Sequence, residues 1–257
     1  MSNVQLEIEG PVAELRLDNP SKLNALTMGM METLETHCAT IETHKKVRVV
    51  LLTATGIRAF CVGADIKEWA ALTPRDFARD WVQKGHRVFD RIARLPVPVI
   101  GVLSGHAFGG GLELAATCDL RVAAPQSTIA LPETSVGIVP GWSGTQRLVR
   151  QIPPAVLKEM ALTNARLSAE RAYQIGFINA VADDPKAAAM SIAGRILETA
   201  PQATETAKWL VSAALEEDKS AAMEAIAGAA LSATAEKAEG VAAFAEKRKV
   251  NFGKVSS

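Results

Sequence analysis

Two glutamates stand 20 positions apart in this chain (113 and 133), each inside a distinctive local sequence. Glu113 closes a segment that begins with Gly109–Gly111, and Glu133 directly follows Pro132. About 45 residues upstream of the glycine run, the segment Phe60–Ile66 contains another glycine. Backbone N–H donors beside two carboxylates are suited to stabilising an enolate and to moving protons next to it. These segments carry the functional hypothesis.

The glycine run is expected at the start of a helix. Leu112–Cys118 contains good helix formers, so the glycines lie where N–H groups are unpaired and the helix dipole favours negative charge. Gly110 and Glu113 are three residues apart and share a face of the first turn. A backbone donor and a carboxylate would then point into one pocket. The alternative is a plain glycine turn whose acid only complements the dipole.

The Phe60–Ile66 segment follows an apolar stretch, and Gly63 allows the backbone to approach a ligand closely. The N–H of Ala64 could complete a two-donor oxyanion hole with that of Gly110. The alternative is a simple connection from strand to helix with Asp65 as the N-cap.

Glu133 lies in an apolar stretch of sequence. Its apolar neighbours along the chain are Ile129, Ala130, Leu131, Val136 and Ile138. A poorly hydrated carboxyl has a raised pKa, which suits a general acid working near neutral pH. The alternative is an acid in a surface turn, the usual position of a single glutamate.

The composition is that of an ordinary globular protein, with 48% hydrophobic and 22% charged residues. The 28 basic residues balance 28 acidic ones, so nothing favours nucleic acid or an anionic membrane as a partner. The three cysteines lie far apart without metal-ligand spacing, and we expect reduced thiols and no metal site. No apolar run approaches about 18 residues and no targeting peptide is evident, which favours a cytoplasmic protein.

Short apolar runs alternate with helical patterns through about residue 195, which predicts an α/β fold. Strands are predicted over residues 13–18, 47–54, 97–103, 119–124 and 128–131. The second and third of these are almost entirely apolar, as in strands buried on both faces. Helices are predicted over residues 26–41, 78–95 and 185–198, the last with Asp184 as N-cap and Pro185 in its first turn.

After Pro201 the sequence becomes rich in alanine. Residues 203–249 are expected to form two or three helices, with Gly228 and Gly240 as weak points or turns. Their apolar faces are narrow for an independent bundle, so we expect them to pack on the body of the protein or on another subunit. The chain is accordingly divided into a core with the active site, residues 1–198, and a helical oligomerisation region, residues 199–257.

Together these residues resemble the crotonase (enoyl-CoA hydratase/isomerase) superfamily over essentially the whole chain. The matching segments, in order, are Asn19–Leu26, Arg58–Glu68, Gly105–Ala115, Leu131–Gly141, Gly144–Leu148 and Phe244–Lys249. The resemblance implies a spiral of ββα turns and a C-terminal helical region that drives formation of homotrimers or hexamers. It also implies a coenzyme A thioester as substrate, with no metal and no redox cofactor.

The resemblance also implies roles for individual residues. The N–H groups of Ala64 and Gly110 would hold the thioester oxygen as it becomes an enolate oxyanion. Glu113 would orient and deprotonate water for attack on Cβ, and Glu133 would manage the proton at Cα. Which carboxyl is acid and which is base stays open, because a coupled pair titrates together. The implied coenzyme A and substrate contacts are Lys22 (on a phosphate), Ala25, Ala64, Asp65, Ile66, Lys67 and Gly110.

Two further groups of residues are candidates by position. Related hydratases usually carry small residues just after Pro140 and Gly141, whereas this chain has Trp142. Its indole, together with Trp69, is a candidate wall of an acyl pocket that includes Pro140 and Gly141, with simple packing as the alternative. Near the C-terminus, Phe244 and Lys247 are candidates for contact with a neighbouring subunit.

The activity implied by the resemblance is that of an enoyl-CoA hydratase, which adds water in the syn sense to a 2-enoyl-CoA, as in the β-oxidation of fatty acids. Isomerases of the superfamily often keep only one glutamate, so the pair favours hydration or dehydration. An enoyl-CoA isomerase or a specialised acyl-CoA dehydratase is the alternative within the superfamily. An RNA-binding relative is a non-enzymatic alternative, for which the only dense basic run is Lys247–Lys249.

Overall fold

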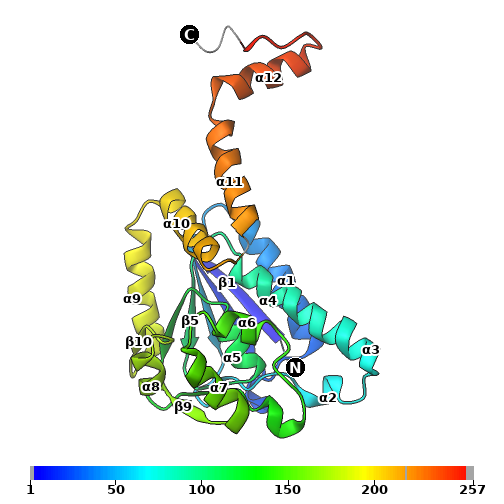
Figure 1. The fold of residues 1–257 in the computed structure, drawn as a ribbon. Coiled ribbons are helices and arrows are strands. Elements are labelled where there is room, and N and C mark those ends of the chain that lie inside the picture. Colours follow the sequence, from blue (N-terminus) through cyan, green and yellow to red (C-terminus); the bar gives the residue numbers. More distant parts are fainter. Residues whose placement is uncertain (1–2, 218, 253–257) are drawn as a thin grey trace. The chain divides into compact units, whose positions relative to one another are not determined.

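A six-stranded sheet in the order β1-β2-β3-β5-β7-β10 is the frame of the computed structural model, which describes residues 3–217 and 219–252 (Figure 1). β1 and β2 pair antiparallel, and every later pair is parallel. The strands are β1 (Asn3–Glu9), β2 (Val12–Asp18), β3 (Val49–Ala54), β5 (Val99–Leu103), β7 (Leu120–Ala123) and β10 (Ala180–Val181).

A second, four-stranded sheet runs in the order β4-β6-β8-β9. β4, β6 and β8 are parallel neighbours, and β9 joins antiparallel. The strands are β4 (Ala59–Cys61), β6 (His106–Phe108), β8 (Thr128–Ala130) and β9 (Arg166–Ser168). Three consecutive strand pairs, β3–β4, β5–β6 and β7–β8, each contribute one strand to each sheet before a helical segment follows. This is the repeated ββα turn that the resemblance implied.

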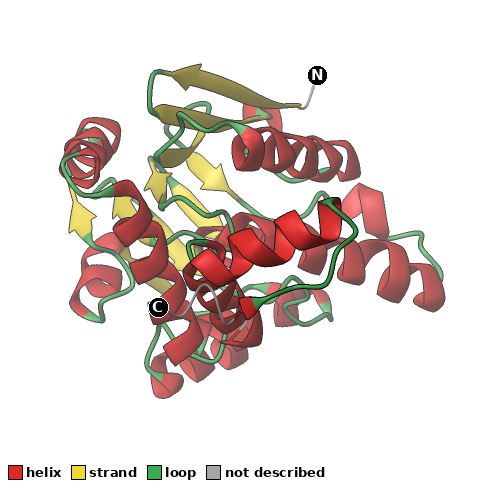
Figure 2. Ribbon diagram, turned by 90° about the horizontal axis from the view of Figure 1, so that it is seen from above, coloured by secondary structure: helices red, strands yellow, loops and turns green. Residues whose placement is uncertain are grey.

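Helical segments occur throughout the chain, and those of residues 1–205 lie against the sheets (Figure 2). In the first part of the chain they are η1 (Pro20–Lys22), α1 (Met28–Thr43), α2 (Ile66–Trp69), α3 (Pro74–Asp76), the π-helical η2 (Phe77–Val82), α4 (Gln83–Ala93) and α5 (Gly110–Ala115). They continue with η3 (Glu133–Val136), α6 (Gly144–Leu148), α7 (Pro154–Thr163), α8 (Ala169–Gln174), α9 (Pro185–Leu197), α10 (Pro201–Ala214), α11 (Lys219–Ser232) and α12 (Ala235–Ala245).

β3 and β5 are buried on both faces of the six-stranded sheet, as their apolar runs predicted. Successive side chains of a strand point to opposite faces. Leu52 of β3 therefore joins the larger apolar cluster, which also contains residues of α1 and α4. Leu51 packs on the other side with Ala189 of α9. The predicted cap of α9 is confirmed, because Asp184 Oδ1 accepts a 2.9 Å hydrogen bond from Ala187 N.

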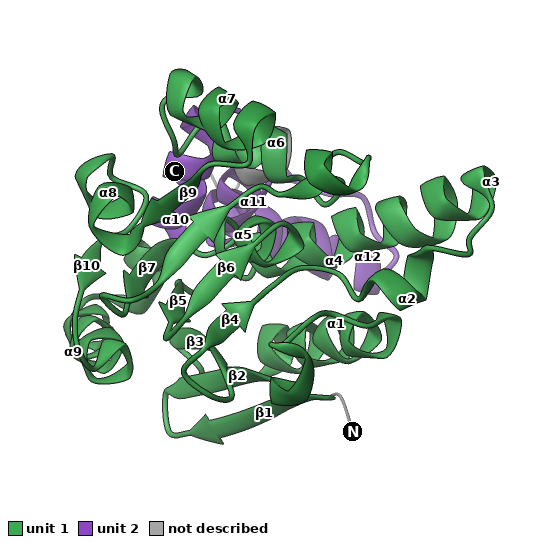
Figure 3. Ribbon diagram, turned by 90° about the horizontal axis from the view of Figure 1, so that it is seen from below, with its two compact units in different colours: residues 1–205 green, residues 206–257 purple. Residues whose placement is uncertain are grey.

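The chain divides into two units, residues 1–205 and 206–257 (Figure 3). The helices expected after Pro201 are α10, which spans the boundary between the units, α11 and α12, but one part of that prediction is wrong. Gly228 lies within α11 and Gly240 within α12, so neither forms a turn. A glycine in a helix costs only about 1 kcal/mol relative to alanine, and the neighbouring alanines outweigh it. The break falls instead just before α12, where Thr234 Oγ1 caps the helix by accepting from Lys237 N. The oligomerisation role of residues 199–257 stays a prediction.

Candidate active site

The spiral brings three distant segments to one edge of the second sheet. β4, β6 and β8 are parallel neighbours, so the ends at which the chain leaves them lie side by side. Ala64 follows β4, Gly110 follows β6 and Glu133 follows β8. The three segments that the sequence singled out are therefore brought together by strand order.

Two backbone N–H groups at this edge have no acceptor among the described residues. Leu26 forms hydrogen bonds with the residues on both sides of Ala64: Leu26 N donates to Gly63 O, and Leu26 O accepts from Asp65 N. The N–H of Ala64 therefore faces away from Leu26. Gly110 is the first residue of α5, where an N–H has no partner within the helix. The segments are close: a Cβ built on Gly63 would lie 3.2 Å from Gly110 N. This arrangement is suited to an oxyanion hole.

Glycine is required at two points of this contact. Gly63 has φ +99°, a conformation that residues with a side chain rarely adopt. A Cβ built on Gly111 would lie 2.0 Å from Cys61 O, so the start of α5 packs directly on the backbone of β4. The glycine run therefore serves close packing as well as the helix start that the sequence predicted.

Glu113 lies in the first turn of α5 and is buried, with 3% of its surface exposed. Its Oε1 accepts hydrogen bonds of 2.8 Å from both Trp142 N and Gly144 N. Burial raises the pKa of this carboxyl, and the N–H groups of Trp142, Gly144 and Gly141, with the charge of Arg147, oppose the rise. These donors stabilise the ionised form.

Within the described part of the chain, Glu133, at the start of η3, lacks donors of the kind that Glu113 has. Both of its carboxyl oxygens are buried, and neither accepts a hydrogen bond from another described residue. Burial raises the pKa of Glu133 to about 7. The backbone N–H of Glu133 itself opposes this rise, and the charge of Glu113 makes a smaller contribution to it. The burial of this carboxyl agrees with the interpretation of Glu133 as a poorly hydrated acid rather than an acid in a surface turn. The two carboxyls thus differ: one is held by N–H donors and one is not.

A cavity of about 570 Å³ adjoins the two glutamates, Ala64 and Gly110. Its polar atoms are few and its walls are mainly apolar. The other lining residues include Trp69, Phe77, Trp81, Val82, His86, Val136, Ile138, Val139, Pro140, Gly141 and Trp142. This volume and composition are typical of a site for a small molecule.

The indole of Trp142 forms a fixed part of the cavity wall. It is buried, and its ring centroid lies 5.0 Å from that of Trp81 and 5.3 Å from that of Phe89. Its Nε1 donates to Trp81 O at 3.2 Å. The six-membered ring lies beside Gly110, where a built Cβ would be 2.9 Å from Cε3. Trp142 therefore packs in the core and lines the cavity at once.

The structure gathers most of the predicted site residues and leaves others elsewhere. Those that line the cavity are Ala64, Ile66, Trp69, Gly110, Glu113, Glu133, Pro140, Gly141 and Trp142. Lys22 and Asp65 form an ion pair of 2.5 Å next to this region, and Asp65 caps α2 through Lys67 N, as its alternative interpretation held. Ala25 is buried outside the cavity lining. Phe244 and Lys247 lie in the second unit.

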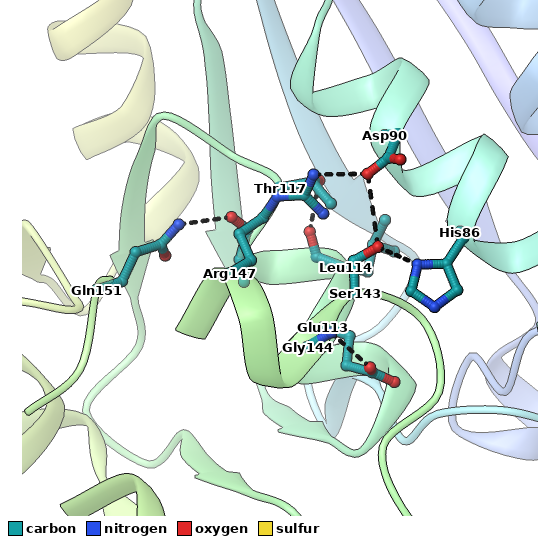
Figure 4. Close-up of polar contacts among 10 residues, drawn as sticks. His86, Asp90, Glu113, Leu114, Thr117, Ser143, Gly144, Arg147 and Gln151 are labelled. Carbon is teal, nitrogen blue, oxygen red and sulfur yellow. Dashed lines mark hydrogen bonds and ion pairs between the residues drawn. The ribbon is translucent and has the colours of Figure 1, made fainter. Parts of the chain in front are cut away.

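Sequence reasoning missed one group of polar residues next to Glu113. His86 and Asp90 of α4 contact Ser143 and Arg147 (Figure 4). Ser143 directly precedes α6, and Arg147 lies within it. His86 and Asp90 are four residues apart and share one helix face, but nothing in the sequence ties that face to Ser143. Their proximity follows from the packing of α4 against the site.

The part of the chain that the structure describes contains no helix long and apolar enough to cross a membrane. Over the same residues, no group of three or more His, Cys, Asp or Glu side chains could hold a metal ion.

The sequence and the fold both match known proteins. The family model for enoyl-CoA hydratase/isomerase matches residues 7–255. A short-chain-enoyl-CoA hydratase of Clostridium acetobutylicum is 34% identical over 97% of each chain, and a crotonyl-CoA hydratase of Syntrophomonas wolfei is 35% identical with the same coverage. A crystal structure of an enoyl-CoA hydratase from Bacillus anthracis has a TM-score of 0.81 at 33% identity, covering 97% of this chain and 98% of that one.

Proposed function

Since the chain belongs to the enoyl-CoA hydratase/isomerase family, as its sequence motifs predicted, we propose that it is an enoyl-CoA hydratase. It adds water reversibly to the double bond of a 2-enoyl-CoA and gives a 3-hydroxyacyl-CoA. The observation that carries the mechanism is the pair of carboxyls on one cavity, Glu113 with N–H donors on Oε1 and Glu133 without any from another described residue. The pair provides a base and an acid from the same residue type.

In the proposed mechanism, the thioester oxygen accepts hydrogen bonds from the N–H groups of Ala64 and Gly110. As hydroxide adds to Cβ, negative charge moves from the double bond onto this oxygen, and the two donors stabilise the enolate. Fixed backbone donors need no reorganisation during the reaction, so this is expected to be the largest electrostatic contribution.

The two glutamates exchange the protons of the reaction. Ionised Glu113 takes a proton from water while the oxygen bonds to Cβ, and protonated Glu133 gives a proton to Cα as the enolate collapses. One C–O bond and one C–H bond form, and the carbon–carbon π bond breaks. The protonation states of the two carboxyls are then exchanged, and proton transfer through solvent restores them.

A panel of 2-enoyl-CoA and 3-enoyl-CoA thioesters tests this function. The conjugated thioester absorbs, so hydration of a 2-enoyl-CoA is followed as loss of absorbance, whereas isomerisation of a 3-enoyl-CoA appears as a gain. We expect rapid loss with 2-enoyl substrates. Turnover restricted to 3-enoyl substrates would assign the chain to isomerisation instead.

The opposite environments of the carboxyls predict a bell-shaped dependence of kcat/KM on pH. Glu133 must be protonated, so activity is expected to fall as pH rises past about 7, where its pKa lies. Glu113 must be ionised, so activity is expected to fall on the acidic side. The measurement is the hydration rate against pH, repeated with Glu133→Gln, which should lack the alkaline limb. An alkaline limb that persists in this variant belongs to another group.

We also propose that Trp142 limits the length of the acyl chain, because its indole lines the cavity beside Gly110. Trp142→Leu is expected to raise the ratio of kcat/KM for an eight-carbon over a four-carbon 2-enoyl-CoA by at least about tenfold, since even one methylene in an apolar pocket changes selectivity by that order. Steady-state kinetics with both substrates measure the ratio.

Phe89→Leu is the matched control for Trp142→Leu. Phe89 packs against the same indole from the core but does not line the cavity. Both substitutions remove a buried ring and should lower thermal stability, whereas only the one at Trp142 should change the substrate ratio. An unchanged ratio in Trp142→Leu would show that Trp142 serves packing and does not limit the length of the acyl chain.

Coenzyme A is proposed to run from the oxyanion hole along Ala64–Lys67, with Lys22 near a phosphate. Lys22 Nζ already pairs with Asp65, so a phosphate would share that ammonium group. We also propose that the protein uses no cofactor besides the coenzyme A of its substrate and that it is cytoplasmic.

A homotrimer or hexamer is proposed from the second unit. Several of its apolar side chains are exposed, and Phe244 is 88% exposed. Apolar surface of this kind is typical of an interface. In the basic run of the RNA-binding alternative, Arg248 pairs with Glu239 and Glu246 of the same unit.

A further inference from the structure

A chain of four polar side chains lies beside Glu113 and takes no part in the mechanism above (Figure 4). Arg147 Nη2 donates to Asp90 Oδ1 at 2.7 Å. Ser143 Oγ lies 3.5 Å from the same carboxylate oxygen and 2.5 Å from His86 Nδ1. The Ser143 hydroxyl is therefore fixed from α4 by an imidazole and a carboxylate.

The backbone of Ser143 is unusual. Its φ of +71° and ψ of 10° lie in the left-handed region, which a residue with a side chain adopts at an energetic cost. Ser143 stands between Trp142 and Gly144, whose N–H groups both donate to Glu113 Oε1. A left-handed residue at this point turns successive N–H groups to one side and forms a concave anion-binding nest.

We propose that Ser143 and His86 are positioning residues that hold this backbone nest on the Glu113 carboxylate. The inference rests on the proposed function in one respect, that ionised Glu113 is the base. Hydrogen bonds to the Ser143 hydroxyl offset the cost of its left-handed backbone. The donors of the nest in turn keep a buried carboxyl ionised where burial favours the neutral acid.

Loss of the hydrogen bonds to the Ser143 hydroxyl should mainly raise the pKa of Glu113. Without the hydroxyl, the turn can relax and the two N–H groups no longer converge on Oε1. The charged and titratable groups facing this region are His86 and Asp90 from α4, Arg147 from α6 and Glu133 from η3. The substitutions at Ser143 and His86 leave the last three in place.

Three variants test the proposal. Ser143→Ala removes the hydroxyl and keeps a Cβ, so the left-handed backbone keeps its energetic cost without the hydrogen bonds that offset it. His86→Leu removes the imidazole, whereas His86→Asn keeps a polar atom near the position of Nδ1 and should retain the hydrogen bond to the Ser143 hydroxyl. His37→Leu is the control, because His37 is a partly buried histidine that bonds Val4 O away from the site.

Two readouts are needed. Ser143→Ala and His86→Leu are expected to lower kcat about tenfold with KM nearly unchanged, and to move the acidic limb of the pH profile up by about one unit. An infrared pH titration reports the protonated carboxyl of Glu113 without any turnover, with the band assigned by its loss in Glu113→Gln. That titration should move up by a similar amount, and His86→Asn and His37→Leu should stay near the wild type.

The outcomes separate this inference from the proposed function. Folded Ser143→Ala and His86→Leu variants whose infrared titration matches the wild type overturn the positioning role, even in an active hydratase. A shifted titration in a protein that hydrates no 2-enoyl-CoA supports the nest and removes the function.

Discussion

Replacing Glu113 by Gln is expected to lower kcat for hydration by about 10²–10⁴-fold, while KM changes little. The amide keeps the size of the side chain but cannot accept the proton of the attacking water. Its oxygen can still accept from Trp142 N and Gly144 N, so the local structure should survive. Steady-state kinetics with a short 2-enoyl-CoA measure the loss.

Glu133→Gln should show a loss of the same order, because the amide cannot supply a proton to Cα. The double variant should fall far short of the product of the two losses, since both groups act on one addition. Glu14→Gln is the control: Glu14 is a partly buried glutamate that pairs with Lys186 and bonds Thr53 outside the site. Near-normal hydration by either single variant would remove that glutamate from the mechanism.

Deleting the Gly110 N–H is expected to lower kcat by about 10²–10³-fold, equivalent to about 3–4 kcal/mol of transition-state stabilisation. Gly110→Pro removes this donor, but a ring at position 110 would also meet the indole of Trp142, where even a Cβ would lie 2.9 Å from Cε3. Replacing Gly110 by glycolic acid exchanges the N–H for an ester oxygen and adds no atom near the indole, so the donor is removed without a clash.

The same ester placed at Gly10 is the control for this backbone change. Gly10 lies in the turn between β1 and β2, and a Cβ there would have no neighbour within 4 Å. Thermal melting of both esters checks that the fold is intact. A folded Gly110 ester with wild-type kcat would show that the thioester oxygen lies elsewhere.

The order of elements in the core could be predicted from local sequence because each signal was strong. The apolar runs 47–54 and 97–103 became β3 and β5, and the glycine run opened α5. The short strands β4, β6 and β9 have three residues each, and their pairing with distant partners stabilises them more than their own sequence does.

The catalytic candidates were accessible to sequence reasoning because the resemblance rests on contiguous motifs around Glu113 and Glu133. The contrast between the environments of the two carboxyls could not be predicted, since the donors Trp142 N and Gly144 N lie 29 and 31 positions from Glu113, at the turn into α6. The role of Ser143 depends on a left-handed backbone conformation that its residue type does not indicate.

The most direct test of the central claim is the fate of water oxygen. A 2-enoyl-CoA is incubated with the protein in water enriched in ¹⁸O, and the product is analysed by mass spectrometry. The account predicts a 3-hydroxyacyl-CoA that carries one ¹⁸O atom at C3, formed by the wild type and much more slowly by Glu113→Gln. Consumption of the 2-enoyl-CoA without ¹⁸O in the product, as in a shift of the double bond, would contradict it.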